Sequence, residues 1–452
     1  MKQQLLNDGR NGSLRGECFM VSIQRKWVGV LWSGCALVMA FIMPLHSYAQ
    51  GECTITQITN STGGVTRYPS LSADGSAIAF QSNRDLVGNN GDFRDEIFLY
   101  QSGVGITQIT DSVGANESAS ANTDGSAIAF VSASDLTGSN ADNNREIFLY
   151  QSGVGFTQIT VSGGNGNFGP TLSTDGSAIA FHSNRNLTGS NGDGSFEIFH
   201  YQSGVDITQI TNSTGGINSD ASINADGSAI AFASNRNLTG NNADQNYEIF
   251  LYQSGVGITQ ITSSTGGRNR FPSISADGSA IAFYSTTDLT GSNADGNQEI
   301  FLYQSGVGIT QITDSAGIGG SAFPSISADG SAIAFASNRD LTGSNADENL
   351  EIFLYQSGVG ITQITDSTAG DNVELSISAD GSAIAFQSTS DLTGSNADGN
   401  REIFLATCAA VPQPPVFPGS QDIPTLSQGG LVLLCGLLGW VLLRRSGRGK
   451  GV

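Results

Sequence analysis

The sequence predicts an all-β protein in which seven similar units close into a ring. The stretch A-D-G-S-A-I-A-F recurs, with small changes, at intervals of 50 to 52 residues. Each unit contains four short apolar or β-branched segments separated by turns, which the 59 glycines suit. These observations predict a seven-bladed β-propeller of four-stranded antiparallel blades over residues 50–408. The repeated stretch has its aspartate at Asp74, Asp124, Asp175, Asp226, Asp277, Asp329 and Asp380.

Residues 1–49 have the pattern of a secretory signal peptide. Arginine and lysine precede an apolar run, and the small residues Ser47 and Ala49 stand before the predicted cleavage site. Translation from Met20 would give the same signal in a shorter form. Two alternatives stay open, a lipoprotein signal that ends on Cys35 and a retained transmembrane helix. The signal peptide predicts export into an oxidising compartment.

The second unit illustrates the strands expected in every blade. Residues 118–123 and 126–132 are predicted to form two strands, joined by a two-residue turn at Asp124 and Gly125. Alternation in A-I-A-F places large side chains on one face and small ones on the other, so that neighbouring sheets can stack. The E-I-F-L-Y segment is apolar on both faces and predicts a strand buried on both sides. The final I-T-Q-I-T predicts a rim strand with exposed threonines and glutamine.

Three repeated segments resemble a known family. The S-x-D-G-S-x-I-A-F strand pair, the S-N-R that follows it at Ser82–Arg84 and Ser183–Arg185, and the E-I-F-L-Y strand are similar to the TolB-type, WD-like β-propeller repeat. The resemblance covers residues 53–408 and implies the propeller fold. It implies little about activity, although propellers of this family can accompany a hydrolase domain.

The two ends of the repeat region predict how the ring closes. The region begins in mid-unit, with I-T-Q-I-T at residues 55–59, and ends with E-I-F-L-A at residues 402–406. The N-terminal strand is therefore expected to complete the last blade. In the other units, a turn of the Q-S-G-V-G type joins the third strand to the fourth. In the last blade this covalent turn is missing, and Cys408 and Cys53 fall on its two sides, which predicts a disulfide. Two unpaired structural cysteines are the alternative.

Each unit carries a polar loop related to D-L-T-G-S-N-A-D-x-N-x-E between its second and third strands. Oxygen ligands at alternate positions of a glycine-containing loop are what calcium coordination requires. The alternative is that asparagine and aspartate bond to their own backbone in Asx turns, while glutamate caps the incoming strand. Two loops differ, with Arg94 and Ser195 in place of the third oxygen ligand. The candidate calcium ligands are Asn140, Asp142, Asn144, Glu146, Asn242, Asp244, Asn246, Glu248, Asn293, Asp295, Asn297, Glu299, Asn345, Asp347, Asn349, Glu351, Asn396, Asp398, Asn400 and Glu402.

The polar loops and the connections between blades are expected on one face of the ring, opposite the D-G turns. The connections between blades differ most from copy to copy. A ligand is therefore expected to meet this face, where Arg67, Tyr68, Arg268, Arg270 and Phe271 are the residues least expected from structure alone. Neutral drift of surface loops explains the same variation.

Charge and composition limit the classes of function. Residues 50–408 hold 37 of the 40 acidic residues but only 10 arginines and no lysine, a net charge of −27. Such a surface repels phosphate backbones, which argues against nucleic-acid binding, and suits divalent cations, basic partners or solubility. The sequence has no nucleophile elbow, His/Cys metal cluster or glycine-rich phosphate loop. His182 and His200 replace other residue types of the remaining copies, so no catalytic residue is predicted.

The C-terminal region predicts a membrane-directed sorting tail. Residues 409–422 form a proline-rich linker, and residues 423–452 contain I-P-T-L, an apolar transmembrane run and a basic end. This arrangement resembles the IPTL-CTERM sorting tail of Gram-negative bacteria, which implies an exosortase-type protease as processing partner. Gly429 replaces the usual tryptophan. An ordinary tail anchor is the alternative. The motif residues are Ile423, Pro424, Thr425 and Leu426.

Together these features predict an exported protein of the Gram-negative cell envelope, anchored in the membrane and then released to the surface or matrix. The expected function is non-enzymatic binding or scaffolding of a surface protein or glycan through one face of the ring. No cofactor is expected, apart from calcium if the polar loops bind it. The alternatives are an enzyme, or enzyme accessory, that acts on polysaccharide or peptide, and a calcium-stiffened structural surface protein.

Overall fold

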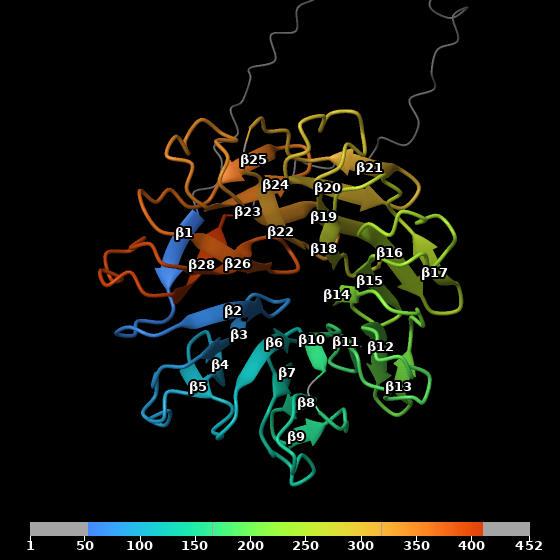
Figure 1. Cartoon of the computed structure of the whole chain (residues 1–452). Coiled ribbons are helices and arrows are strands. Elements are labelled where there is room, and N and C mark those ends of the chain that lie inside the picture. The colour runs from blue at the N-terminus through green and yellow to red at the C-terminus, as the bar shows by residue number, and fades with distance from the viewer. Residues whose placement is uncertain (1–52, 165, 318, 410–452) are drawn as a thin grey trace, which may run out of the picture. The chain divides into compact units, whose positions relative to one another are not determined.

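The computed structural model describes residues 53–164, 166–317 and 319–409, which form seven four-stranded antiparallel sheets around a central axis (Figure 1). The predicted seven-bladed propeller is therefore confirmed. No helix in these residues is long and apolar enough to span a membrane. The predicted signal peptide, the sorting tail and all of the linker except Ala409 lie outside the described residues.

Within each blade the strands follow one another from the axis to the rim (Figure 1). The first strands line the axis: β2 (Thr66–Leu71), β6 (Asn116–Ala121), β10 (Asn167–Leu172), β14 (Asn218–Ile223), β18 (Asn269–Ile274), β22 (Ser321–Ile326) and β26 (Asn372–Ile377). The second strands are β3 (Ala77–Ser82), β7 (Ala127–Ser132), β11 (Ala178–Ser183), β15 (Ala229–Ser234), β19 (Ala280–Ser285), β23 (Ala332–Ser337) and β27 (Ala383–Ser388).

The outer half of each blade consists of a buried third strand and a short rim strand. The third strands are β4 (Glu96–Gln101), β8 (Glu146–Gln151), β12 (Glu197–Gln202), β16 (Glu248–Gln253), β20 (Glu299–Gln304), β24 (Glu351–Gln356) and β28 (Glu402–Cys408). The rim strands are β5 (Gly105–Gln108), β9 (Gly155–Gln158), β13 (Asp206–Gln209), β17 (Gly257–Gln260), β21 (Gly308–Gln311), β25 (Gly360–Gln363) and β1 (Cys53–Gln57).

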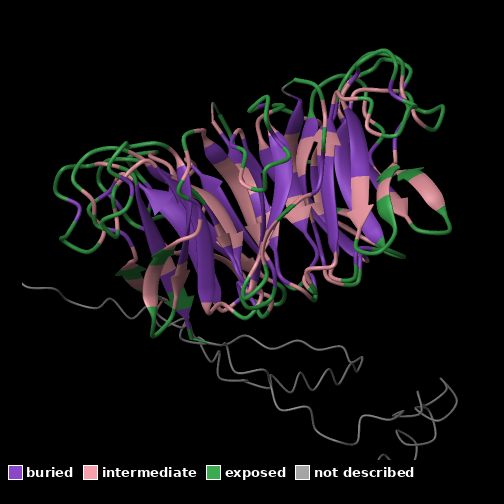
Figure 2. Cartoon of the chain, turned by 90° about the horizontal axis from the view of Figure 1, so that it is seen from below, coloured by how far each residue is buried: buried purple, intermediate pink, exposed green. Residues whose placement is uncertain are grey.

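The ring has two different faces. Four antiparallel strands per blade bring the polar loops and the connections between blades to one face, which we call the loop face. The D-G and S-G-V-G turns lie on the opposite face, which we call the turn face. Figure 2 shows the buried strands between these two sets of exposed connections.

Neighbouring blades pack a face of small side chains against a face of large ones. Ala77 and Ala79 of β3 share one hydrophobic cluster with Ile128 and Phe130 of β7, and all four side chains are fully buried. Small and large faces interdigitate at the density of a protein interior, and burial of each phenylalanine contributes roughly 2 kcal/mol. The alternation in A-I-A-F therefore has the consequence predicted from the sequence.

The D-G turn is longer than the two-residue hairpin predicted from the sequence. The Ser72 N–H donates to the Ala77 carbonyl (2.8 Å), so the four residues between them form the turn. The Asp74 carboxylate accepts from the Ser72 hydroxyl (2.7 Å) and the Ser76 N–H (2.9 Å), and these bonds support a wider turn. The first strand of the second blade accordingly ends at Ala121, two residues earlier than predicted.

The last threonine of I-T-Q-I-T is buried, and the prediction that it is exposed was wrong. Thr262 is 1% exposed; its hydroxyl donates to Glu248 and accepts from the Ile249 N–H (2.8 Å). The Glu248 carboxylate also accepts from the N–H and hydroxyl of Ser264 (both 2.7 Å) and from the Asn269 amide (2.9 Å). We call this arrangement of Glu248, Thr262 and Ser264 the Glu–Thr–Ser cluster. It links the third strand to the chain that leads into the next blade.

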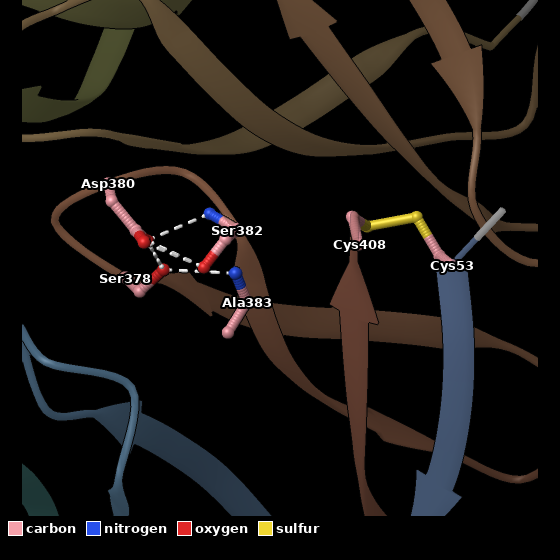
Figure 3. The surroundings of a disulfide bond; sticks show 6 residues. All are labelled: Cys53, Ser378, Asp380, Ser382, Ala383 and Cys408. Carbon is pink, nitrogen blue, oxygen red and sulfur yellow. Dashed lines mark hydrogen bonds between the residues drawn. A yellow bond between two sulfur atoms is a disulfide. The ribbon is translucent and has the colours of Figure 1, made fainter. Parts of the chain in front are cut away.

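The ring closes by strand exchange between the two ends of the propeller, as predicted. β1 pairs with β28, and Cys53 lies opposite Cys408 in this pairing. The two cysteines form the predicted disulfide, with a Cα–Cα distance of 4.0 Å, beside the D-G turn at Asp380 (Figure 3). The Cys408 N–H also donates to the Ser382 carbonyl of that turn (2.7 Å).

Candidate binding site at the channel mouth

The first strand of every blade contains a β-bulge near its start. In β2, the pairing with β3 shifts between Arg67 and Ser70, and the bulged residue Tyr68 has a φ of +53°. Residues with side chains seldom adopt this left-handed conformation, and a bulge redirects the side chain that it contains. The bulged residues are Tyr68, Ser118, Gly169, Asp220, Phe271, Phe323 and Glu374, with φ between +50° and +59°.

The seven copies, which are nearly identical elsewhere in their strands, differ at the bulged residues and their neighbours. The residue before the bulge and its partner in the second strand both vary from blade to blade: Phe168 faces His182, and Arg270 faces Tyr284. Equivalent positions of a propeller form rings around its axis, so these residues surround the end of the central channel on the loop face. We call this region the channel mouth. The residues before the third strands also vary and are Asp95, Arg145, Phe196, Tyr247, Gln298, Leu350 and Arg401.

An ion pair joins the fourth and fifth blades at the channel mouth. Arg270 donates from Nε to Asp220 Oδ2 (2.8 Å) and from Nη2 to Asp220 Oδ1 (3.0 Å). The same guanidinium lies over the rings of Tyr247 (4.8 Å) and Phe271 (5.1 Å). Burial alone would lower the pKa of Arg270, but its bonds to Asp220 raise it above the ordinary value. Such a bidentate pair, shielded by aromatic rings, is a strong contact.

Arginines of other blades are paired differently. Arg67 donates from Nη2 to Asp95 Oδ2 (2.9 Å) and lies over the Tyr68 ring (5.6 Å), while the Arg145 Nε donates to Glu117 Oε1 (2.7 Å). Four of the five residues singled out from the sequence therefore lie at the mouth, in β2 and β18. The fifth, Arg268, immediately precedes β18.

His182 is packed between aromatic rings on one side of the mouth. Its ring centroid lies 5.7 Å from that of Phe168 and 5.8 Å from that of Phe196. Burial lowers the pKa of His182 to about 4, although the charge of Asp220 acts in the opposite direction. The side chain is therefore uncharged near neutral pH and serves as a packing residue.

A cavity of about 250 Å³ lies at the mouth and is lined by residues of the third to the seventh blade. Its lining includes four consecutive bulged residues, Asp220, Phe271, Phe323 and Glu374. The Phe271 and Phe323 rings contact each other, with centroids 5.1 Å apart. Burial raises the pKa of Glu374, and the charge of Arg401 opposes that rise. The site thus combines two carboxylates with two adjacent aromatic rings.

The predicted calcium ligands are engaged in hydrogen bonds within the protein. In the fourth blade, the Asn242 amide donates to the Asn246 carbonyl (2.9 Å) and closes the loop. Asp244 accepts from the Gly266 N–H of the next connection (2.9 Å), and Glu248 belongs to the Glu–Thr–Ser cluster. The Asn242 amide thus bonds within its own loop, whereas Asp244 and Glu248 bond to the chain that leads into the next blade.

Several asparagine oxygens of these loops are nevertheless buried without a hydrogen-bond partner in the described part of the chain. In the third blade, Ser195 stands at the repeat position that Asn144 and Asn246 occupy in other blades. Its hydroxyl lies 2.9 Å from Asp193 Oδ1 and 2.8 Å from Glu197 Oε1. The described residues contain no group of three or more His, Cys, Asp or Glu that could hold a metal. Calcium binding stays a prediction. The unpartnered oxygens belong to Asn144, Asn242, Asn246, Asn293, Asn297, Asn345, Asn349 and Asn400.

Solved structures with the same architecture have very different sequences. An oligogalacturonate lyase from Vibrio parahaemolyticus aligns with a TM-score of 0.53 and 12% identity, over 79% of this chain and 98% of that chain. The β-propeller domain of the Trilobed protease from Pyrococcus furiosus aligns with a TM-score of 0.53 and 11% identity, over 79% of this chain and 99% of that chain. TolB from Acinetobacter baumannii is 20% identical over 70% of this chain and 67% of that chain, with a TM-score of only 0.41.

These likenesses bear on the fold alone. The propeller implied by the TolB-type resemblance is confirmed, and the lyase and protease names describe those proteins only. No family model and no curated protein matches the sequence.

Sequence reasoning missed the bulge, and with it Asp220, Phe323 and Glu374. These residues stand at the same repeat position as Tyr68 and Phe271, which were singled out. Comparison of the seven copies position by position, including the strands as well as the connections, would have found all five.

Proposed function

We propose that this protein is an exported propeller that binds a partner at its channel mouth and catalyses no reaction. One observation carries the proposal: the copies differ at the channel mouth, and the differing bulged residues of four consecutive blades line one cavity there. Scaffold positions repeat because every blade needs the same packing. A ligand without sevenfold symmetry needs different side chains from different blades, so variation among the strand residues at the mouth is expected of a binding site.

The chemistry of the mouth supports recognition over catalysis. Asp220 is paired with Arg270, and Arg67 with Asp95, so these charges are held in fixed positions. His182 is uncharged near neutral pH and enclosed by rings, which does not suit a residue that exchanges protons with a substrate. Export to the Gram-negative envelope and processing by an exosortase-type protease are part of the proposal and draw on the sequence of the two ends.

A second candidate is a structural role stiffened by calcium. It is favoured by the buried asparagine oxygens of the polar loops, which a cation or water would meet. Both candidates involve the loop face, and calcium bound in the loops would also fix the channel mouth.

The proposal is tested with the purified whole chain on peptide and glycan arrays, with and without calcium. The mouth variant carries Phe271→Ala and Phe323→Ala. The control carries Val256→Ala and Val307→Ala, at turn-face residues that are 74% and 75% exposed. We expect a defined peptide or glycan to bind the wild type and the control but not the mouth variant. Binding that survives in the mouth variant, or conversion of oligogalacturonate or peptide by the wild type, would contradict the proposal.

A further inference from the structure

The Asp220–Arg270 pair indicates which kind of group the mouth accommodates. A carboxylate at the bulge of one blade accepts both bonds of a guanidinium from the next blade. The guanidinium also lies over the bulged phenylalanine of its own blade, Phe271. The bulge geometry is therefore suited to a planar cation between a carboxylate and an aromatic ring.

The junction between the seventh and the first blade has a similar set of residue types, an acid, an arginine and an aromatic residue, in a different arrangement. Glu374 takes the place of Asp220, Arg67 that of Arg270, and Tyr68 that of Phe271. Arg67, however, pairs with Asp95 of its own blade. Within the described residues, the Glu374 carboxylate has no hydrogen bond or ion pair, and only the charge of Arg401 acts on it. It is the equivalent of Asp220 without its guanidinium.

The surroundings of Glu374 favour a cation that arrives on an apolar stem. The cavity next to Glu374 is also lined by Phe323, Pro324 and Leu375. Arg401 takes the place of Tyr247 beside this carboxylate; it is exposed and forms no ion pair with Glu374 within the described residues. Glu374 is half-buried, and a half-buried carboxylate without a bonded partner gains from a cation that excludes water while it binds.

The size of the cavity and the charge of the ring indicate the source of the cation. About 250 Å³ is smaller than the usual pocket for a whole small molecule, and it suits one side chain of a larger partner. The net charge of −27 over residues 50–408 attracts basic partners and speeds their approach.

We propose that the channel mouth binds an arginine or lysine side chain of a basic peptide segment, with its cationic group on Glu374 and its stem against Phe323. This inference rests on the proposed binding function and names its ligand class. An amino sugar carries an ammonium group, as lysine does. It lacks the flexible apolar stem that would pack against Phe323, Pro324 and Leu375 in the cavity.

The test is calorimetric titration of the whole chain with an acetylated and amidated Gly-Arg-Leu-Gly peptide. The matched probe has citrulline in place of arginine, which keeps the shape and removes the charge. The variants are Glu374→Gln and Phe323→Leu, and the control is Glu348→Gln, a 63% exposed carboxylate on the same face. We expect citrulline, Glu374→Gln and Phe323→Leu each to weaken binding by about tenfold or more, and Glu348→Gln to leave it unchanged.

Equal binding of the arginine and citrulline peptides to the wild type would overturn the inference, even if a variant failed to fold. Binding of a chitosan oligomer that depends on Glu374, without binding of the peptide, would replace the peptide source by an amino sugar. If arrays reveal an uncharged ligand that depends on the mouth, this inference fails and the proposed function stands. If mouth substitutions change no binding at all, both fail.

Discussion

His182 illustrates how one substitution on a repeated scaffold changes chemistry. The same place holds glutamine, valine, alanine or tyrosine in other blades. In the third blade, Phe168 and Phe196 enclose the imidazole, and burial lowers its pKa to about 4 from the ordinary 6.5. The ring is thus a neutral packing element that acid would charge.

His182 is expected to make stability depend on pH. Between its ordinary pKa of 6.5 and the folded value of about 4, the unfolded chain binds a proton here and the folded chain does not. The free energy of unfolding therefore falls as the pH drops through this window. We expect urea unfolding from about pH 7 to about pH 4 to show a loss larger by about 1 to 3 kcal/mol in the wild type than in His182→Gln. Equal losses in the two proteins would rule this out.

The buried threonines are a second test at the residue scale. Thr262→Val keeps the shape but removes the hydroxyl that serves Glu248 and the Ile249 N–H, so we expect a loss of about 1 to 3 kcal/mol in chemical denaturation. Thr259→Val, at an exposed position of β17, is the control and should change stability by less than about 0.5 kcal/mol. Similar effects of both substitutions would mean that the Glu–Thr–Ser cluster does not stabilise the blade.

At the scale of elements, loops and turns are held by side chains rather than by backbone pairing alone. Asp74 organises the D-G turn, and Asp244 ties a polar loop to the connection that enters the next blade. These contacts give aspartate a structural role in both elements. In the polar loops, calcium would have to compete with these hydrogen bonds for the same oxygen atoms.

The polar loops give a prediction about metal removal. We expect EDTA to leave the melting temperature of the whole chain unchanged, because Glu248 and its equivalents accept hydrogen bonds from protein groups. Differential scanning calorimetry with EDTA, and then with excess calcium, measures this. A fall in melting temperature that calcium but not magnesium reverses would instead assign calcium to the asparagine oxygens of these loops.

At the scale of the whole molecule, the ring is closed by noncovalent pairing of β1 with β28 and by one disulfide. Cys53 and Cys408 are separated by 355 positions in sequence, so their bond restricts the unfolded chain strongly. The seven hydrophobic clusters each lie between two blades, and opening the seventh blade would expose its shared cluster with the first.

Removal of the disulfide is expected to lower stability substantially. In the chain-entropy account, a loop closed over 355 positions contributes roughly 6 kcal/mol. We expect that loss for Cys53→Ser with Cys408→Ser in guanidinium unfolding. The control is Ser102→Ala with Val104→Ala, at the equivalent hairpin of the first blade, where the covalent turn is intact. A double-serine variant as stable as the wild type would show that strand pairing alone closes the ring.

Local patterns sufficed for much of the fold, because they repeat. The alternation in A-I-A-F predicted the packing faces, and the phase of the two ends predicted the pairing of Cys53 with Cys408. The buried Thr262 escaped prediction because it follows the end of its strand, where alternation no longer applies. The length of the D-G turn was not predicted, because the turn is held by hydrogen bonds to the Asp74 side chain and not only by backbone pairing.

The sequence by itself determined the number of blades, their strand order and the closure of the ring, since each follows from the order of units along the chain. Only the tertiary structure decided that Asp220, Phe271, Phe323 and Glu374 share one cavity. Successive members of this set are about one repeat apart in sequence, and rotation around the axis brings them together. The bulge then turns them toward the mouth, and that conformation depends on pairing within each blade, which local sequence patterns do not reveal.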